Sequence, residues 1–323
     1  MSAPLPVGVI GVGALGRHHA RHLAAFHGVN LVGVHDVDAA RAAAVAAEVG
    51  TRAFPDLGEL LGRVEAVTIA VPTPAHAEVG LLALGEGVPV LMEKPLASSL
   101  EEADRLVREA DRGGLQLQVG HIERFNQAIR AAQPHLHDIR YFDSHRLAPF
   151  QARGTDVAVV LDLMIHDLDL VLHLTGGADV VDVRASGVAV LTPHLDIATA
   201  RVEFANGAVA TVTASRMARD RVRKLRMFQP NGYFSLDLAA GSGEFMRLRP
   251  GFRPGNSSGL EEIVQQVALA APRADALALE LASFVHAIRG GEETVVSATE
   301  GRAALALALR VTEAVGVAPI PVA

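Results

Sequence analysis

The sequence predicts an α/β protein of two domains, in which a doubly wound parallel sheet precedes a mostly antiparallel sheet. Three observations carry this prediction. Short apolar runs alternate with helical segments over the first third of the chain. From about residue 121 the strands lengthen and alternate in polarity, with little helix between them. The chain has 323 residues, half of them apolar, which is enough length for about two domains.

The first domain, expected over residues 1–121, is built from βαβ repeats. Strands are predicted at residues 6–10, 31–35, 51–54, 66–71, 88–92 and 115–119, and helices at 17–26, 41–50, 57–63, 75–86 and 99–111. Parallel strands place their carboxyl ends at one edge of the sheet, where ligands bind in folds of this kind. Residues far apart in the chain should therefore share one rim: Gly11, Asp36, Pro72, Lys94 and Gly120.

The second domain, expected over residues 122–323, should hold a largely antiparallel sheet. Strands are predicted at 139–146, 180–191, 197–204, 208–217, 223–229 and 233–237, and helices at 161–174, 276–289 and 298–315. Asn206-Gly207 and Asn231-Gly232 each lie between apolar runs, which is typical of hairpin turns. The clear alternation indicates a sheet with one face packed on helices.

A glycine-rich turn, Gly11-x-Gly13-x-x-Gly16, joins the first strand to the first helix. The first glycine permits a tight turn, the second lets the backbone approach a pyrophosphate, and the third lets helix and strand pack closely. Free N–H groups at the helix N-terminus then point at the phosphates. The next strand ends in Asp36, twenty residues past Gly16, where a carboxylate binds the adenosine ribose hydroxyls. A glycine turn without a ligand is the alternative.

Asp36 also bears on the choice of cofactor. A carboxylate there accepts hydrogen bonds from a free 2′-hydroxyl and repels a 2′-phosphate, so NAD is predicted over NADP. Arg41 is close in sequence but lies in an alanine-rich helix, where we expect it on a solvated face.

Lys94 is one of only two lysines among 29 basic residues, and it follows an apolar strand in Glu93-Lys94-Pro95. An ammonium can act in acid–base chemistry when it is desolvated, whereas a guanidinium stays charged. Lys94 is therefore a candidate catalytic residue. The alternative is a surface lysine that survives in an arginine-biased composition.

A second group of polar residues falls within the helix predicted at 161–174. Asp162 and His166 are one turn apart on one face, so the carboxylate can orient the imidazole as a general base. Asp169 follows three residues later. One alternative is a buried histidine with satisfied hydrogen bonds. Another is a metal-dependent hydrolase with Asp162, His166 and Asp169 as ligands, which would leave the glycine turn unused.

Composition excludes other classes of protein. Cysteine is absent, so there is no disulfide framework or thiolate metal site, and a cytoplasmic setting is expected. The N-terminal apolar run breaks at glycines, so we expect neither a signal peptide nor a membrane span. A net charge of -7 argues against a general nucleic-acid role.

Taken together, these motifs resemble the Gfo/Idh/MocA oxidoreductases, NAD(P)-dependent enzymes that act on sugars, inositols and nucleotide sugars. The resemblance covers nearly the whole chain: the glycine turn, Glu93-Lys94-Pro95, Gly120-x-x-x-Arg124-Phe125-Asn126 and Asp162-x-x-x-His166-x-x-Asp169. It implies an N-terminal Rossmann domain with bound NAD and a C-terminal α/β domain with a large open sheet. That sheet often mediates oligomerisation in the family, so a homodimer or homotetramer is expected. Met164 departs from the family, in which many members have glycine at this position.

The resemblance also implies roles for individual residues. The catalytic residues would be Lys94, His166 and Asp162. The cofactor-binding residues would be Gly11, Gly13, Ala14, Leu15, Gly16, Asp36, Pro72, Thr73, His76, Glu93 and Lys94. The substrate residues would be Arg124, Asn126, Asp169 and Arg216, and no metal is expected.

Within the family, residues 120–126 and 161–167 look most like the UDP-N-acetylglucosamine 3-dehydrogenase group. Six cations within residues 216–226 of an acidic chain also suit a nucleotide sugar. In a strand, Arg219, Arg221 and Arg223 would project from one face toward a diphosphate, although a solvated face or a subunit contact is an alternative. Other possible functions are a dehydrogenase of a free aldose or inositol, and a non-catalytic NAD-sensing regulator. A regulator would have no reason to keep both Lys94 and the Asp162–His166 pair.

Overall fold

The structure is a computed structural model that describes residues 3–151, 157–252, 259–290 and 294–316. The chain forms two compact units. The first comprises Met1–Ile122 and Asp275–Leu305, and the second comprises Glu123–Ala274 and Ala306–Ala323. The first unit thus includes a late segment that the division after residue 121 had placed in the second domain.

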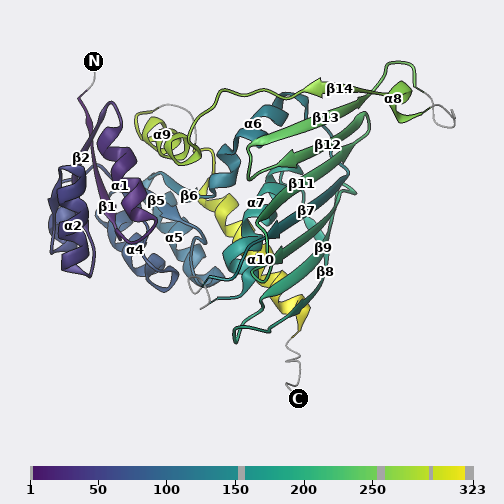
Figure 1. The fold of residues 1–323 in the computed structure, drawn as a ribbon. Coiled ribbons are helices and arrows are strands. Elements are labelled where there is room, and N and C mark those ends of the chain that lie inside the picture. Colours follow the sequence, from purple (N-terminus) through teal and green to yellow (C-terminus); the bar gives the residue numbers. More distant parts are fainter. Residues whose placement is uncertain (1–2, 152–156, 253–258, 291–293, 317–323) are drawn as a thin grey trace. The chain divides into compact units, whose positions relative to one another are not determined.

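The first unit contains a sheet of six parallel strands in the order β3-β2-β1-β4-β5-β6. Its strands are β1 Leu5–Ile10, β2 Val29–His35, β3 Arg52–Ala53, β4 Ala66–Ile69, β5 Val90–Glu93 and β6 Leu117–Gly120. Strands β1, β2, β5 and β6 are labelled in Figure 1. The strand order reverses between β1 and β4, and such a switch point opens a crevice at the carboxyl ends of the strands. The predicted doubly wound sheet is confirmed.

Local sequence explains where the helices of this unit begin and end. The helices are α1 Gly16–Ala25, α2 Ala39–Val49, α3 Leu57–Leu61, α4 His76–Gly85, α5 Leu100–Gly113 and α9 Ala276–Ile288, with the 3₁₀ turn η1 Thr73–Ala75. Asp38 and Ser99 cap α2 and α5 by accepting a hydrogen bond from a first-turn N–H group. Gly50 and Gly114 end the same helices in the left-handed conformation.

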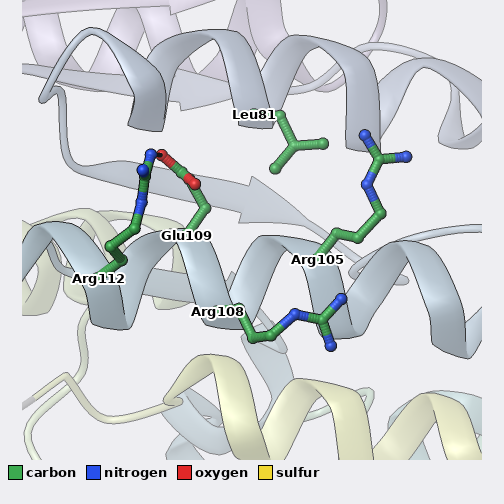
Figure 2. A pocket seen from close by; sticks show the side chains of 5 residues that line it. All are labelled: Leu81, Arg105, Arg108, Glu109 and Arg112. Carbon is green, nitrogen blue, oxygen red and sulfur yellow. Dashed lines mark hydrogen bonds and ion pairs between the residues drawn. The ribbon is translucent and has the colours of Figure 1, made fainter.

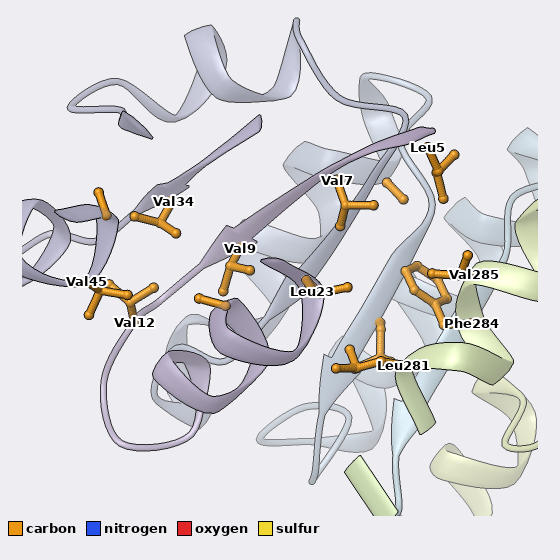
Figure 3. Packing of buried hydrophobic residues seen from close by; sticks show 14 of the residues in the cluster. Leu5, Val7, Val9, Val12, Leu23, Val34, Val45, Leu281, Phe284 and Val285 are labelled. Carbon is orange, nitrogen blue, oxygen red and sulfur yellow. The ribbon is translucent and has the colours of Figure 1, made fainter. Parts of the chain in front are cut away.

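The core of the first unit explains why α9 belongs to it. Leu281, Phe284 and Val285 of α9 are at most 2% exposed and pack in one cluster with side chains of β1 and α1 (Figure 3). Burying three large apolar side chains removes several kcal/mol of unfavourable hydration, about 1.5–3 kcal/mol for each. That burial holds the late helix against the N-terminal sheet.

The second unit contains a sheet of eight strands in the order β14-β13-β12-β11-β7-β10-β9-β8. Its strands are β7 Tyr141–Leu147, β8 Val180–Val188, β9 Ile197–Phe204, β10 Val209–Ser215, β11 Val222–Gln229, β12 Gly232–Asp237, β13 Ser242–Leu248 and β14 Val264–Ala268. All neighbours pair antiparallel except β7 and β10. Both Asn-Gly hairpins, β9–β10 and β11–β12, are confirmed.

Helices cover one face of this sheet. The helical segments are η2 Ile122–Phe125, α6 Gln127–Ala132, η3 Gln133–His135, η4 Val160–Met164, α7 Ile165–Leu174 and α8 Leu260–Ile263, and α10 Ala298–Val315 is divided between the units after Leu305. α6 contacts β12 and β13, and α7 contacts β7 and β10, on the same side of the sheet (Figure 1). In the described part of the chain no helix is long and apolar enough to cross a membrane.

Two local details of this unit differ from expectation. The strand predicted at 223–229 is confirmed as β11, but residues 218–221 form a loop before it, so Arg219 and Arg221 do not project from a strand face beside Arg223. The helix predicted at 161–174 opens with the π-helical turn η4, in which Asp162 lies. The strands β13 and β14 were not predicted. β13 opens with Ser-Gly and β14 is only five residues long, which weakens the apolar alternation in both.

Candidate active site

The glycine turn of the first unit has the shape that a pyrophosphate requires. Gly11 has φ +80°, and a Cβ there would lie 2.8 Å from the main chain of Ala70. A Cβ on Gly16 would lie 1.8 Å from the Gly11 carbonyl oxygen, so this glycine is required for close packing. A Cβ on Gly13 would meet no heavy atom within 4 Å. The turn is therefore closely packed at Gly11 and Gly16 and open at Gly13. Ala14 and Leu15 continue it, both exposed, up to the start of α1.

Asp36 lies beside this turn, and its carboxylate already binds groups of the protein. Its side chain accepts hydrogen bonds from the backbone N–H groups of Val12 and Asp38, both at 2.9 Å. Arg41 also contacts it, with Nη1 at 3.2 Å from Oδ1, and reaches Asp38 as well. Arg41 was expected on a solvated face, and it is half exposed but paired. The Asp36 carboxylate is thus fixed at the edge where the ribose would lie.

The segment after β4 is fixed by His76. Pro72 precedes the turn η1, which starts at Thr73, and His76 opens α4 with 1% of its surface exposed. Its Nδ1 lies 2.8 Å from the Pro95 carbonyl oxygen and its Nε2 lies 2.9 Å from the Val71 carbonyl oxygen. Burial lowers the pKa of His76, whereas these carbonyl oxygens and the charge of Glu93 act to raise it. Both ring nitrogens face the main chain, so His76 joins the ends of β4 and β5.

The segment after β5 holds Lys94 next to a buried contact between Glu93 and His19. Glu93 Oε1 lies 3.0 Å from Nε2 of His19 on α1, and Oε2 accepts a hydrogen bond from the Lys94 backbone N–H at 3.2 Å. Burial acts to raise the pKa of Glu93, but His19 and the charge of Lys94 outweigh it and lower that pKa. Glu93 therefore stays a carboxylate that fixes the main chain of Lys94. Lys94 itself is half-buried.

In the second unit, Asp162 and His166 lie on either side of a change in helix geometry. Asp162 belongs to the π-helical turn and His166 to the second residue of α7, and both side chains are half-buried. π-helical turns are uncommon and occur frequently at functional sites. The wider turn changes the angle between the two side chains from the value that a regular α-helix would give.

The predicted substrate residues Arg124 and Asp169 bind each other. Arg124 donates from Nε to Asp169 Oδ2 and from Nη2 to Oδ1, both at 2.8 Å. The side chains are only 2% and 1% exposed, so each charge is compensated by the other. Because Asp169 is engaged in this way, its use as a metal ligand is not supported. Among the residues that the structure describes, no group of three metal-ligating side chains is found.

Asn126 connects three segments of the second unit. Its Nδ2 donates to Glu123 Oε2 and to the Leu238 carbonyl oxygen, both at 2.8 Å, and its Oδ1 caps α6 by accepting from Ala128 N. Both amide hydrogens are therefore used within the protein. The substrate role of Asn126, like those of Arg124 and Asp169, stays a prediction.

Sequence analysis missed a buried charge network centred on Arg146 of β7. Arg146 donates from Nε to Asp167 at 2.5 Å and from Nη1 to Glu123 at 2.8 Å, and Ser144 donates to Asp167 at 2.8 Å. Burial alone would lower the pKa of Arg146, but the charges of Asp167 and Glu123 raise it. The sequence holds one signal of this network. Arg146 is an even number of residues from Phe142 and Ser144, so in a strand all three side chains point to the same, buried face.

Arg216 lies just after β10 and is 4% exposed. Its Nη2 donates to the Val157 carbonyl oxygen at 2.8 Å, and its Nε lies 4.0 Å from Asp196. Asp196 in turn accepts from three backbone N–H groups of residues 190–192. The structure thus shows Arg216 holding the chain just before η4, and contact with a substrate stays a prediction.

A groove on the first unit lies apart from all these residues. Leu81 of α4 and Arg105, Arg108, Glu109 and Arg112 of α5 line it, and Arg112 is paired with Glu109 (Figure 2). No predicted site residue lines this groove. Its arginines belong to the middle and end of α5, whereas the carboxyl edge of the sheet lies where α5 begins.

Comparison with known proteins agrees with this geometry. Residues 5–121 match the oxidoreductase family with an NAD-binding Rossmann fold, and residues 120–234 match the GFO/IDH/MocA C-terminal domain. A UDP-N-acetylglucosamine 3-dehydrogenase from Acidithiobacillus ferrooxidans is 43% identical over 95% of this chain and 96% of its own. The chain belongs to the Gfo/Idh/MocA oxidoreductase family. It is accordingly an NAD-dependent dehydrogenase, as the glycine turn and Asp36 predicted.

A solved structure of that dehydrogenase matches nearly the whole chain, whereas other relatives are similar over less of it or only in fold. A crystal structure of the A. ferrooxidans dehydrogenase superposes with a TM-score of 0.90 over 97% of this chain and 98% of that one. The myo-inositol dehydrogenase Hyg17 of Streptomyces leeuwenhoekii is 32% identical over 71% of this chain and 72% of its own. GenD2 from gentamicin A biosynthesis, solved with NAD, shares the fold at 21% identity and a TM-score of 0.81, covering 98% of this chain and 95% of its own.

Proposed function

We propose that the protein oxidises the 3-hydroxyl of UDP-N-acetylglucosamine with NAD. The observation that carries this proposal is the 43% identity to the A. ferrooxidans dehydrogenase, which runs through both units and leaves few residues of either chain unmatched. Similarity to the inositol dehydrogenase covers less of the chain and is lower. Oxidation of a free inositol or aldose is therefore the second candidate.

The residues of the first unit fit NAD. The open space over Gly13 admits the pyrophosphate, α1 supplies backbone N–H groups, and the Asp36 carboxylate accepts from the ribose hydroxyls. The segment Pro72–Thr73 and the Glu93–Lys94 turn lie at the carboxyl ends of β4 and β5, where the nicotinamide end would be held. When bound, NAD accepts the hydride from the substrate carbon.

Three side chains handle the proton and the charge in the proposed reaction. His166 removes the proton from the substrate hydroxyl, and Asp162 orients the imidazole and stabilises the imidazolium. The role proposed for Lys94 is to stabilise the negative charge that develops on the substrate oxygen. Glu93 supports this role because its carboxylate fixes the Lys94 main chain and keeps a negative charge beside the ammonium.

NADH formation with a panel of alcohols tests the proposal. The panel contains UDP-N-acetylglucosamine, UDP-glucose, N-acetylglucosamine and myo-inositol, each assayed with NAD and with NADP. We expect kcat/KM to be highest for UDP-N-acetylglucosamine with NAD. Reducing the product with borodeuteride should place deuterium at carbon 3 of the sugar. A higher kcat/KM for myo-inositol, or deuterium at another carbon, would contradict the proposal.

The uncovered face of the eight-stranded sheet is the proposed oligomer interface. It carries a cluster of half-exposed aromatic rings in which Phe228 lies 5.8 Å from Tyr141 and 5.5 Å from Tyr233. Phe228 and Tyr141 are 39% and 37% exposed, which favours burial against a second copy. Light scattering should show a homodimer or homotetramer that Phe228→Glu dissociates. A cytoplasmic location also stays a proposal, based on the absence of cysteine.

A further inference from the structure

Arg223 occupies an open position on an otherwise buried face of the second sheet. It shares strand parity with Leu225 and Met227 of β11, which are both fully buried. The Arg223 side chain is nevertheless 39% exposed. Its backbone carbonyl oxygen accepts a hydrogen bond from Leu238, the residue whose own carbonyl oxygen binds Asn126. The Arg223 main chain is thus fixed, and its side chain remains partly accessible to solvent.

The carboxylates around Arg223 are already engaged by other groups. Its Nη1 lies 3.5 Å from Glu123 Oε1, the oxygen that accepts from Arg146 at 2.8 Å. The other oxygen of Glu123 accepts from Asn126. Asp167 is bound by Arg146 through both of its oxygens. Among the described residues, the Arg223 side chain donates no hydrogen bond.

Arg146 and Arg223 lie beside the same two carboxylates. Arg146 donates hydrogen bonds to both Asp167 and Glu123, whereas Arg223 lies 3.5 Å from Glu123. Arg146 is 3% exposed and cannot reach a ligand. The accessible positive charge beside these carboxylates is therefore that of Arg223, with Arg221 exposed in the preceding loop. Burial and then the charge of Arg146 lower the pKa of Arg223, and the charge of Glu123 acts to raise it.

This cation lies close to the proposed catalytic helix within the second unit. Arg223 is paired across the sheet with Arg146, which binds Asp167, the residue after His166. A guanidinium binds phosphate oxygens through paired N–H groups, and a diphosphate carries a negative charge on each phosphate. Free sugars and inositols have no such group.

We propose that Arg223 binds the diphosphate of the substrate and so restricts the enzyme to nucleotide-linked sugars. This inference rests on the proposed nucleotide-sugar substrate and assigns its specificity to one residue. Arg221, exposed in the loop before β11, adds a weaker contact. Arg219, which was expected on the same strand face, lies in that loop as well.

Arg223→Gln tests the proposal, with Arg226→Gln as its matched control. Arg226 lies on the same strand but on the uncovered face, with Nη1 also 3.5 Å from a carboxylate oxygen, that of Asp143. Titration calorimetry with UDP and with uridine measures binding without turnover. We expect Arg223→Gln to raise the Kd of UDP about 10- to 100-fold and to leave uridine binding unchanged. Arg226→Gln should change neither Kd. Because Arg226 lies on the face proposed as the oligomer interface, light scattering identifies the oligomer that each variant forms, so that the Kd values are compared at the same oligomeric state.

Steady-state kinetics separate substrate contact from support of the charge network. Loss of a diphosphate contact raises KM for UDP-N-acetylglucosamine while kcat changes less than about threefold. Loss of support for Asp167 and His166 would instead lower kcat. Arg223→Lys keeps the charge but loses the paired geometry, so an intermediate KM is expected, and this variant also serves if Arg223→Gln does not fold.

The outcomes distinguish this inference from the proposed function. UDP binding that is equal in wild type and Arg223→Gln, or no UDP binding by the wild type, overturns the role of Arg223. If the wild type oxidises UDP-N-acetylglucosamine in that case, the proposed function stands. If UDP binding depends on Arg223 but no nucleotide sugar is oxidised, the anion site stands and the proposed function is wrong.

Discussion

In the first unit the predicted cofactor residues are positioned by main-chain geometry, whereas in the second unit the predicted substrate residues are held by buried charge pairs. Gly11 and Gly16 are required where the backbone approaches itself, and His76 joins two backbone carbonyl oxygens. By contrast, Arg124 and Asp169 bind each other in a buried pair. Main-chain requirements restrict a position to one residue type, so they leave a signature in the sequence. Charge pairs leave only scattered arginines and carboxylates.

The largest effect on turnover should come from Lys94, the first-unit residue whose side chain is proposed to stabilise the charge on the substrate oxygen. Lys94→Ala removes the donor that stabilises the developing alkoxide, so kcat should fall about 10³-fold or more. NAD affinity, measured by calorimetry, should change little because the main chain is retained. The control is Lys224→Ala, which removes the only other lysine, exposed and paired with Asp237. Near-normal turnover in Lys94→Ala would exclude the lysine from the chemistry.

The buried Arg124–Asp169 pair of the second unit should have the largest effect on the free energy of unfolding. Asp169→Asn replaces the carboxylate that binds the buried Arg124 guanidinium with a neutral amide, and the free energy of unfolding in urea should fall by about 3–5 kcal/mol. Replacing both partners, by Arg124→Met with Asp169→Leu, should recover most of that loss. Glu203→Gln removes the partner of the exposed Arg201 and should cost less than about 1 kcal/mol. Equal losses of unfolding free energy in Asp169→Asn and Glu203→Gln would show that the buried pair stabilises the fold no more than the exposed pair.

The same contrast explains what the sequence could predict. The parallel sheet of the first unit follows from βαβ repetition, and the Asn-Gly hairpins follow from turn chemistry. The π-helical turn at Asp162 could not be predicted because its sequence has ordinary helical spacing. The partners of Arg146 lie 21 and 23 residues away, so only tertiary folding brings them together. Lys94 and Asp162 were found through motifs, and their roles stay proposals.

Gly16 and Gly13 test whether main-chain geometry positions the cofactor in the first unit. Gly16→Ala places a Cβ 1.8 Å from the Gly11 carbonyl oxygen, so it should destabilise the first unit by about 1–3 kcal/mol. Gly13→Ala meets no protein atom within 4 Å and should keep near-wild-type stability. Its methyl group would fill the space proposed for the pyrophosphate, so NAD affinity should fall at least about tenfold. Normal NAD affinity in Gly13→Ala would place the pyrophosphate elsewhere.

Asp36 is the one cofactor residue of the first unit that depends on side-chain charge. Asp36→Ser removes the carboxylate that would repel a 2′-phosphate and releases Arg41, which now lies 3.2 Å from it. The ratio of kcat/KM for NADP to that for NAD should rise about 10- to 100-fold. The matched control, Asp38→Ser, removes the other carboxylate bound by Arg41 and should shift the ratio much less. Equal shifts would mean that release of Arg41, and not loss of the carboxylate at residue 36, sets the preference.

Glu93 is a buried carboxylate of the first unit that contacts His19 and so resembles the buried carboxylates of the second unit. Its pKa is lowered in the folded state by His19 and Lys94, so the carboxylate stabilises the fold above its unfolded-state pKa of about 4.3. That contribution is lost as the pH falls through the lower folded-state value. Glu93→Gln should therefore cost about 1.5–3 kcal/mol near pH 7, and the difference from wild type should shrink only below about pH 4. Unfolding in urea across this pH range measures it. If the difference in unfolding free energy between wild type and Glu93→Gln stayed constant below pH 4, Glu93 would act through its hydrogen bonds alone and not through its charge.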